Sequence, residues 1–246
     1  MISKAEIKQV RLLHQKKYRE EKRLFIAEGP KLVNELVGST FPVKEIFATK
    51  EFQVPSSKFQ VQVINEKELI QISALATPNQ VLGVFEIPDM KLNHESLKNE
   101  LVLALDDIRD PGNLGTIIRI ADWFGIKNIL CSETCVDLFN PKVMQATMGS
   151  IARVNVYFVD LENSLTILSR SMPVFGSTID GANIYTQELT SNGIILIGNE
   201  SKGVSGNILK LASEKISIPS FSSGADSLNA AIATAVICSE FKRRKI

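Results

Sequence analysis

Three short segments of this 246-residue chain combine glycine with small amide, hydroxyl or charged side chains, a composition suited to holding a small ligand. They read DDIRDPGNLGTIIRIADWFGI (residues 106 to 126), IGNESKGVSG (197 to 206) and IPSFSSGADSLNAAIATAV (218 to 236). Each follows or contains the end of a short aliphatic run and leads into a stretch with helical periodicity. Ligands bind beyond the carboxyl ends of parallel strands, so all three segments lie where a small molecule could be bound.

Each segment also has a purely structural explanation. In DPGNLG the residues are ordinary turn formers followed by a capped helix. Glu200 could be a capping acid, and Ser227 of SLN could be a serine N-cap. Arg119 fits this explanation less well, because it falls among aliphatic residues, where a guanidinium usually has a specific anionic partner. A Walker-type phosphate loop is excluded, since the lysine of SKG is followed by glycine and the upstream glycine spacing is wrong.

The elements that must position these segments begin at residue 101. From there, continuous aliphatic strands alternate with helices, which predicts an α/β domain with a buried, mostly parallel sheet. The last helix is expected from Ser227 to about Lys242, with apolar Ile232, Val236 and Phe241 on it.

The first 90 residues predict a smaller α/β sandwich. A basic helix is expected at residues 3 to 17 and a second at Pro30 to Val37, with short strands between and after them. The stretch from Pro88 to Lys98 is polar and shows no periodicity, so the junction is placed there. We therefore expect domains at 1–90 and 101–246, joined by a linker at 91–100.

The overall charge of +1 conceals a local concentration of basic residues. Residues 1 to 31 carry nine Lys or Arg against four acids, and a second basic cluster, residues 242 to 245, ends the chain. Such clusters bind phosphate backbones when the fold turns them to one side, and are otherwise solvated helix faces. They support an RNA partner.

Several classes of protein are excluded by composition. The longest apolar runs are far shorter than the roughly 20 residues of a membrane helix, and the N-terminus shows no secretory signal. Three cysteines without a Cys-x-x-Cys pair, and only two histidines, support neither a disulfide framework nor a zinc site. We expect a cytoplasmic protein without a metal or a membrane partner.

Together, in this order and spacing, the three segments resemble the motifs of the SpoU/TrmH family of SPOUT methyltransferases. The resemblance rests on Asn113 and Arg119 in a DPxNLGxxxR frame, on GxExxG around Glu200, and on an IP strand followed by Ser227 and Asn229 in SLN. It covers residues 101 to 246. The N-terminal part, notably QKKYREEKRLFIAEGPKLV, resembles the ribosomal-protein-like RNA substrate-binding domain that many members carry.

The resemblance implies an enzyme that transfers a methyl group from S-adenosylmethionine to a ribose 2′-hydroxyl of structured RNA. It also implies a deep trefoil knot, threaded after about residue 175, although true knots are very rare. The cofactor would be bound chiefly through backbone groups of the knot loops. The residues to which this binding is carried over are Thr178, Leu196, Gly198, Gly203, Ile218, Ser220 and Leu228.

The family's catalytic pocket maps onto Arg119, with Asn113, Glu200, Ser227 and Asn229 shaping it. Arginine is an awkward general base, because its pKa exceeds about 12. We therefore expect Arg119 to clamp an RNA phosphate and stabilise the developing alkoxide.

Two features depart from the family pattern. The loop between Pro219 and Ser227 is one residue longer than the commonest spacing, with Ser220 where methionine is frequent. Gln145 stands where many relatives have arginine, so a phosphate contact is not assigned to it.

The resemblance further implies a homodimer, with the last helix and the first-motif helix near the interface. Ribosomal RNA is favoured over transfer RNA by the separate basic domain, which is an argument from analogy. The alternatives are a transfer-RNA 2′-O-methyltransferase and a non-catalytic RNA-binding ribosome-assembly protein on the same fold. A Rossmann-type methyltransferase or dehydrogenase is excluded, because no G-x-G-x-x-G follows an early strand.

Overall fold

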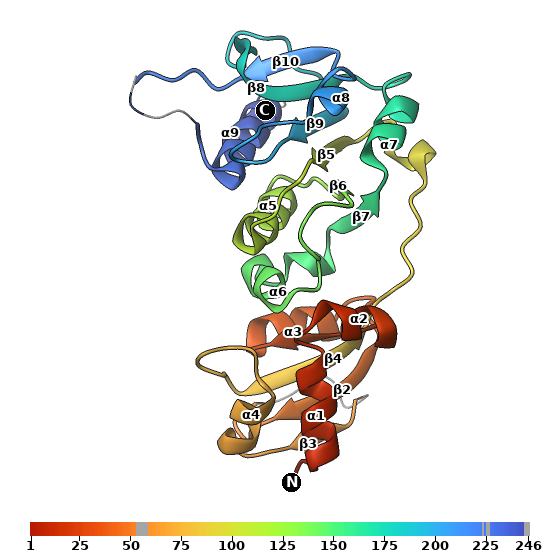
Figure 1. Ribbon diagram of the computed structural model, residues 1–246, viewed down its shortest axis with the longest axis vertical. Helices are drawn as coiled ribbons and strands as arrows, with labels where there is room; N and C mark the ends of the chain where they lie inside the picture. Colours follow the sequence, from red (N-terminus) through yellow and green to blue (C-terminus); the bar gives the residue numbers. More distant parts are fainter. Residues whose placement is uncertain (53–58, 223, 225–226, 244–246) are drawn as a thin grey trace. The chain divides into compact units, whose positions relative to one another are not determined.

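A computed structural model describes residues 1–52, 59–222, 224 and 227–243 (Figure 1). The chain divides into two compact units. Unit 1 comprises Met1–Asp89 and Asp137–Ala152, and unit 2 comprises Met90–Val136 and Arg153–Ile246. Of the C-terminal basic cluster, Arg244 and Lys245 lie outside the described residues.

Unit 1 contains a four-stranded sheet in the order β1-β4-β2-β3. Strand β4 is antiparallel to β1 and β2, while β2 and β3 are parallel. The strands are β1 (Leu24–Glu28), β2 (Val43–Ala48), β3 (Val61–Val63) and β4 (Val81–Glu86). The helices are α1 (Lys4–Leu12), α2 (Lys16–Lys22), α3 (Pro30–Val37), α4 (Glu66–Ile72), α6 (Pro141–Thr147) and the 3₁₀ turn η2 (Ser150–Ala152).

The prediction of one basic helix at residues 3 to 17 is wrong, because two helices, α1 and α2, occupy this part of the chain. Gln15 has extended backbone angles, which separates the two helices. Leu13, just after α1, packs into the apolar core of unit 1, and its carbonyl accepts a hydrogen bond of 2.8 Å from the buried Arg19 guanidinium. The break therefore frees the Leu13 carbonyl to satisfy part of the hydrogen-bonding capacity of the buried Arg19 guanidinium.

Residues 137 to 152 fall in the sequence expected to form the C-terminal domain, yet they pack with unit 1. The Arg19 Nε donates to an Asp137 carboxylate oxygen over 3.1 Å. The rings of Phe25 and Phe139 lie 4.5 Å apart between centroids. The Gln145 amide donates to the carbonyl of Glu28 over 2.8 Å, so its side chain has a partner within the unit.

Unit 2 contains a six-stranded sheet in the order β10-β8-β9-β5-β6-β7, and every pairing in it is parallel. The strands are β5 (Leu101–Leu105), β6 (Asn128–Ser132), β7 (Asn155–Val159), β8 (Val174–Asn183), β9 (Gly193–Ile197) and β10 (Glu214–Ser217). The helices are α5 (Pro111–Trp123), α7 (Leu161–Leu168), α8 (Gly206–Leu209), α9 (Ala230–Arg243) and the 3₁₀ turn η1 (His94–Leu97). The α/β class with a mostly parallel sheet is confirmed.

The strand order reverses next to β5, which pairs with β6 on one side and with β9 on the other. Both β5 and β9 are buried along their whole length. A reversal of strand order in a parallel sheet opens a crevice at the carboxyl ends of the strands, where ligands bind. The sheet topology therefore directs attention to residues 106 onward and 198 onward.

The start of the last helix differs from the sequence expectation. Helix α9 begins at Ala230, and Asn229 rather than Ser227 caps it, with its Oδ1 accepting from the Ala231 N–H over 3.0 Å. Of the apolar residues on α9, Phe241 is buried against Phe175, but Ile232 is 55% exposed. The resemblance places this helix near a dimer interface, so the exposure of Ile232 in a single chain does not contradict that expectation.

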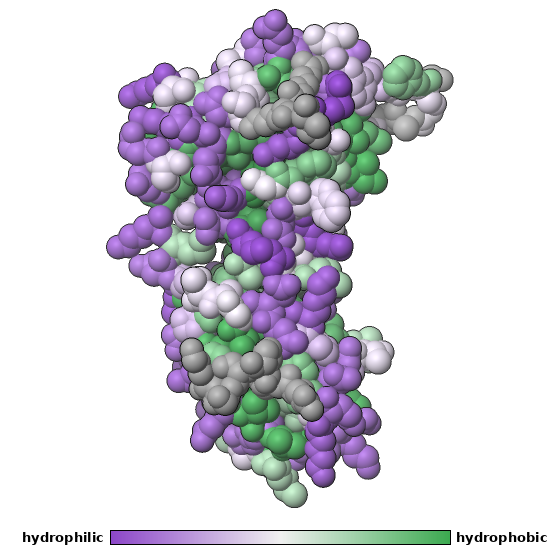
Figure 2. All heavy atoms as spheres, turned by 180° about the vertical axis from the view of Figure 1, so that it is seen from behind, coloured by the Kyte–Doolittle hydropathy of each residue, from purple (hydrophilic) through white to green (hydrophobic). Residues whose placement is uncertain are grey.

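No helix in the described ranges is long and apolar enough to cross a membrane. On the face drawn in Figure 2, the apolar residues form separate patches among hydrophilic ones.

Candidate functional site

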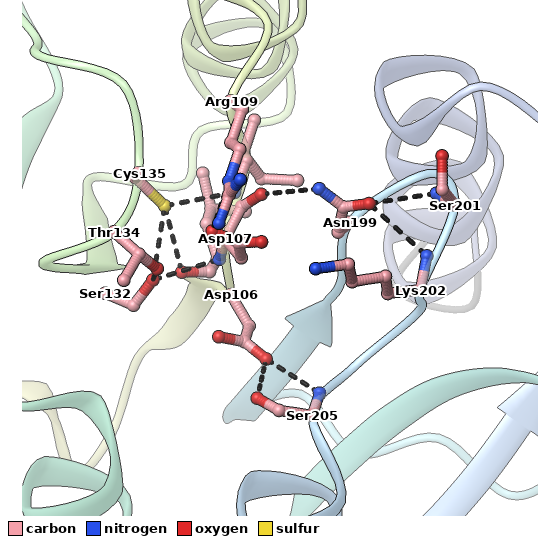
Figure 3. Close-up of polar contacts among 12 residues, drawn as sticks. Asp106, Asp107, Arg109, Ser132, Thr134, Cys135, Asn199, Ser201, Lys202 and Ser205 are labelled. Atoms are coloured by element: carbon pink, nitrogen blue, oxygen red, sulfur yellow. Dashed lines mark hydrogen bonds and ion pairs between the residues drawn. The ribbon is translucent and has the colours of Figure 1, made fainter.

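The carboxyl ends of β5 and β9 are joined by Asp106, a buried carboxylate that is 4% exposed. Its backbone N–H donates to the Ile197 carbonyl over 2.9 Å, which extends the strand pairing by one residue. Its side chain accepts hydrogen bonds from the backbone N–H of Ser205, over 2.8 Å, and from the Ser205 hydroxyl (Figure 3). This carboxylate therefore fastens the far end of the 198–204 loop to the end of β5.

Asn199 fastens the near end of the same loop. Its Nδ2 donates to the Asp107 carbonyl over 2.9 Å, and its Oδ1 accepts from the backbone N–H groups of Ser201 and Lys202 (Figure 3). The loop also closes on itself, because Asn199 and Gly203 exchange backbone hydrogen bonds of 3.1 and 2.8 Å. The 198–204 loop is thus held at both ends before any ligand is bound.

The backbone of Gly198 lies against the other end of this loop. A Cβ atom on Gly198 would come within 2.2 Å of backbone atoms of Gly203 and Val204. Gly203 has a positive φ of 67°, a conformation that glycine adopts without strain. Two of the predicted cofactor-binding residues are therefore required to be glycine by the backbone geometry.

The three motifs meet through a chain of side-chain hydrogen bonds in unit 2. Asn113, in the first turn of α5, donates through its Nδ2 to Glu200 Oε1 in the 198–204 loop. Asn229, at the start of α9, donates through its own Nδ2 to Asn113 Oδ1 over 2.9 Å. The chain joins residues 87 and 116 positions apart in the sequence.

This hydrogen-bonded chain decides between the two explanations given above. Glu200 is bonded to Asn113 and is not a capping acid, whereas Asp110 is an ordinary N-cap, accepting from the Asn113 N–H over 2.8 Å. Asn229 combines both roles, with its oxygen capping α9 and its nitrogen on Asn113. Capping alone would not select side chains that also meet one another across three loops.

The remaining predicted catalytic residues are exposed. Arg119 lies on the outer face of α5, and its side chain makes no hydrogen bond or ion pair within the described part of the chain. Its guanidinium is free to meet an anion from outside. Ser227 is also exposed and lies three residues before α9, without a hydrogen bond to another described residue.

Of the other predicted cofactor-binding residues, Thr178 lies on β8 and Leu196 on β9, and these two strands lie side by side (Figure 1). Leu196 pairs with Gly176 of β8, two residues before Thr178. The Thr178 hydroxyl oxygen is buried and has no hydrogen-bond partner among the residues described. Since a buried polar atom without a partner is costly, this hydroxyl points to a group that an added ligand would satisfy.

The outer members of this set are more accessible. Ile218 is half-buried after β10, and Ser220 is exposed, with its hydroxyl donating to the Ser222 carbonyl over 2.7 Å. Leu228 is 46% exposed. The side chain of Leu196 is fully buried, so any contact it makes with a ligand must come from its backbone.

Beside this site, Cys135 belongs to a second polar cluster that the sequence did not indicate (Figure 3). Its Sγ accepts from the Ile108 N–H over 3.3 Å. A hydrogen bond from Cys131, aided by Ser132 and the Ile108 N–H, lowers the pKa of Cys135 from 9.0 to about 7 against the effect of burial. The thiol therefore stabilises the turn that leads from β5 into α5.

Asp107 is held by the same cluster. It has a positive φ of 58°, its N–H donates to the Ser132 hydroxyl, and its carboxylate pairs with Arg109 over 2.8 Å. Burial opposes ionisation of this carboxyl, but hydrogen bonds from Arg109 and Thr134 outweigh it and lower its pKa. The segment between β5 and α5 is thus fixed on both sides. No group of three His, Cys, Asp or Glu in the described ranges could hold a metal ion.

Comparison with known proteins agrees with this geometry. The model for the SpoU rRNA Methylase family matches residues 100–239. The model for the MRM3-like substrate binding domain matches residues 4–83.

Individual relatives are similar over nearly the whole chain. The 23S rRNA (guanosine(2553)-2′-O)-methyltransferase RlmP of Bacillus subtilis (strain 168) is 31% identical over 237 residues, which is 94% of each chain. The structure of a TrmH-family protein from Porphyromonas gingivalis is 34% identical, with a TM-score of 0.90 and 99% of each chain covered. The AdoMet-bound rRNA methyltransferase from Sinorhizobium meliloti is 30% identical, with a TM-score of 0.87, covering 100% of this chain and 98% of that chain.

Proposed function

Because the chain belongs to the SpoU rRNA methylase family, we propose that it transfers a methyl group from S-adenosylmethionine to a ribose 2′-hydroxyl of ribosomal RNA. The observation that carries this proposal is the hydrogen-bonded chain of Glu200, Asn113 and Asn229, which brings the three motifs together. The Bacillus subtilis relative is named as a 23S rRNA methyltransferase, and the Sinorhizobium meliloti structure is an rRNA methyltransferase with AdoMet bound.

The residues of this chain fit a bound methyl donor. The buried Thr178 hydroxyl lacks a partner among the described residues, and the close backbone approach at Gly198 leaves no room for a side chain there. S-adenosylmethionine, when bound, supplies an activated methyl group on a sulfonium. The chain's own residues must then hold the donor, align the ribose oxygen and exclude competing nucleophiles.

We assign the handling of the RNA phosphate and of the developing charge to Arg119. Its guanidinium is exposed and unpaired with the described residues, so no internal carboxylate competes for it. A guanidinium binds phosphate bidentately and stays charged, so it can orient the nucleotide and stabilise an alkoxide, with the proton lost to that phosphate or to water. The paired amides of Asn113 and Asn229 position the α5 and α9 starts around it.

Replacing Arg119 with lysine tests this assignment. The R119K variant should keep its fold and its affinity for S-adenosylmethionine, because the Arg119 side chain makes no hydrogen bond or ion pair with a described residue. Turnover on ribosomal RNA should fall by roughly 10²–10³, the usual cost of removing a transition-state donor. Arg170→Lys, at another exposed arginine of unit 2, is the matched control and should leave turnover unchanged. Near-normal turnover by R119K would refute the assigned role.

We further propose that the protein is a homodimer through the outer faces of α5 and α9. These helices pack on each other within the chain. Each also leaves a large apolar side chain in solvent, Trp123 at 85% and Ile232 at 55% exposure. Exposed apolar surface of this kind is typical of an interaction site. Sedimentation should show a dimer at micromolar concentration that Ile232→Asp dissociates, and a monomeric wild type would contradict the proposal.

Several expectations stay predictions. These are the domain limits at 1–90, 91–100 and 101–246, the trefoil knot after about residue 175, a cytoplasmic location and the absence of a metal. Two experiments separate the alternatives. If calorimetry detects no binding of S-adenosylmethionine, a non-catalytic RNA-binding protein is favoured. Methylation of transfer RNA and not ribosomal RNA would favour the transfer-RNA enzyme.

A further inference from the structure

Unit 1 carries a hollow of about 520 Å³ beside α1, to which α4 contributes one residue. Figure 1 shows α1 and α4 in this unit, and the two helices are in contact. The polar side chains that line the hollow are Lys4, Lys8, Arg11, His14, Gln15 and Gln71. No Asp or Glu is among its described lining residues, so the hollow has one sign of charge.

The three cations of the hollow lie on one face of α1. Lys4, Lys8 and Arg11 are spaced i, i+4 and i+7, which places them in a row along the helix axis. At 1.5 Å per residue the row is about 10 Å long. All three side chains are exposed, and none makes a hydrogen bond or ion pair with a described residue.

The cations of the following helix are different. On α2, Lys16 pairs with Glu20 over 3.6 Å, and Lys22 pairs with Glu21 over 2.9 Å. The carboxylate of α1 itself, Glu6, is engaged with Ser3, whose backbone N–H donates to it over 2.7 Å. Lys16 and Lys22 of α2 therefore have carboxylate partners on their own helix, whereas Lys4, Lys8 and Arg11 of α1 have none among the described residues.

The opposite face of α1 is already occupied by the fold. Val10 and Leu13 are buried in the core of unit 1, at 3% and 4% exposure. An interfacial membrane helix needs an apolar face that it can insert into the bilayer. Because the buried residues of α1 are taken by its own sheet, a lipid surface fits this helix poorly.

We propose that the Lys4–Lys8–Arg11 row of α1 binds the sugar–phosphate backbone of the RNA substrate, at a site separate from the methyl-donor pocket. The row supplies sequence-independent phosphate contacts, and the amides of Gln15 and Gln71 can bond ribose hydroxyls or base edges. The matched substrate-binding model begins at residue 4, so this helix lies inside it. This inference rests on the proposed function in so far as RNA is taken as the substrate.

The size of the effect follows from counterion release. Each phosphate contact contributes about 0.7 to 0.9 to the slope of log affinity against log salt. Replacing two cations with glutamine should reduce that slope by about 1.4 to 1.8, and weaken binding roughly 15- to 30-fold at 0.15 M salt. Replacing Lys4 alone should weaken it roughly 4- to 6-fold.

The test compares two double variants of the full-length protein that lose the same charge. In Lys8→Gln/Arg11→Gln, two unpaired cations of the hollow are removed, whereas in Lys16→Gln/Lys22→Gln two paired cations of α2 are removed. The probe is an in vitro transcript of large-subunit ribosomal RNA, titrated by fluorescence anisotropy between 0.05 and about 0.3 M potassium chloride, the range in which phosphate contacts dominate. The first variant should show the predicted loss of slope and affinity, and the second a change below about threefold.

Methyl transfer measured on the same proteins separates this inference from the proposed function. The first variant should raise the KM for RNA with kcat and S-adenosylmethionine affinity unchanged, since none of these residues belongs to the donor pocket. Equal losses in both variants would indicate a diffuse charge effect and overturn the inference. The inference would also be overturned if Lys8→Gln/Arg11→Gln bound RNA as the wild type does but no longer pelleted with phosphatidylserine vesicles. A wild type that binds RNA through α1 but transfers no methyl group would instead overturn the proposed function alone. Lys4→Gln repeats the test should the first variant fail to fold.

Discussion

Gly198→Ala is the substitution that tests the preorganised 198–204 loop most directly. The added methyl carbon would lie 2.2 Å from the Gly203 carbonyl carbon and the Val204 nitrogen, against an ordinary contact distance of at least 3.4 Å. The obstacle is backbone, so no side-chain rotation relieves it, and the loop must move by about 1 Å. Overpacking of this kind costs about 1–3 kcal/mol of folding free energy.

The same movement should weaken the methyl donor. Two backbone groups of the loop, at Gly198 and Gly203, are proposed to contact it, and a neutral hydrogen bond contributes about 1 kcal/mol. Losing both amounts to about 2 kcal/mol, or roughly thirtyfold in Kd. Titration calorimetry with S-adenosylmethionine measures the affinity, and urea unfolding measures the stability.

Gly206→Ala is the matched control in the same region. A Cβ on Gly206 meets nothing within 4 Å, and its φ is not positive, so alanine should be neutral or stabilise by about 0.4–1 kcal/mol. Wild-type donor affinity and stability in Gly198→Ala would show that the loop yields without cost. The reasoning from backbone approach would then be refuted.

Three further changes probe the supporting structure. Asp137→Asn leaves the guanidinium of Arg19, 2% exposed, without its charged partner, and should lower the free energy of unfolding by about 3–5 kcal/mol in urea titrations. Burial raises the pKa of Glu28 above 4.5, partly offset by hydrogen bonds from Ser73 and Ala74, so its contribution to stability is present below pH 4.5 and lost as the pH rises through the raised value. Glu28→Gln should remove that loss, so the free energy of unfolding at pH 7 relative to pH 4 should be higher in the variant than in the wild type. Iodoacetamide at pH 7.5 should label Cys135, with its pKa of about 7, before Cys238, whose pKa burial raises to about 12, and peptide mass mapping would show the order.

The sheet of unit 2 was predictable because its strands are continuous aliphatic runs, buried from end to end in β5, β6 and β9. The helix from Pro30 to Val37 was placed correctly, since proline at the first turn and glycine before it mark its start. The single N-terminal helix was wrong, because the reason for its break is not local. It depends on Arg19, which needs the Leu13 carbonyl and a carboxylate 118 residues away.

Only those site residues that belong to the motifs of the family resemblance could be predicted from the sequence. Asn113, Glu200 and Asn229 were identified, and their meeting is confirmed by the hydrogen bonds between them. Asp106 and Asn199, which fasten the loop, stand beside the motifs but gave no periodicity or spacing signal of their own. The function of each side chain depends on which backbone group lies within hydrogen-bond distance of it, and the register of the strands decides that.

The exposure of Arg119 is consistent with the proposed role of its guanidinium in binding the RNA phosphate and stabilising the alkoxide. A guanidinium engaged by Glu200 would be neutralised and held away from the RNA, yet Glu200 is bonded to the neutral amide of Asn113. Asn113 is in turn oriented by Asn229, so the amides occupy the carboxylate without adding charge. The arrangement allows two separate tasks: amides and a carboxylate hold three loops together, and Arg119 is left for the RNA phosphate contact that we propose. Asn113→Asp would place a second carboxylate against Glu200. The repulsion should separate the loops that these residues join, whereas Arg119 should be unaffected.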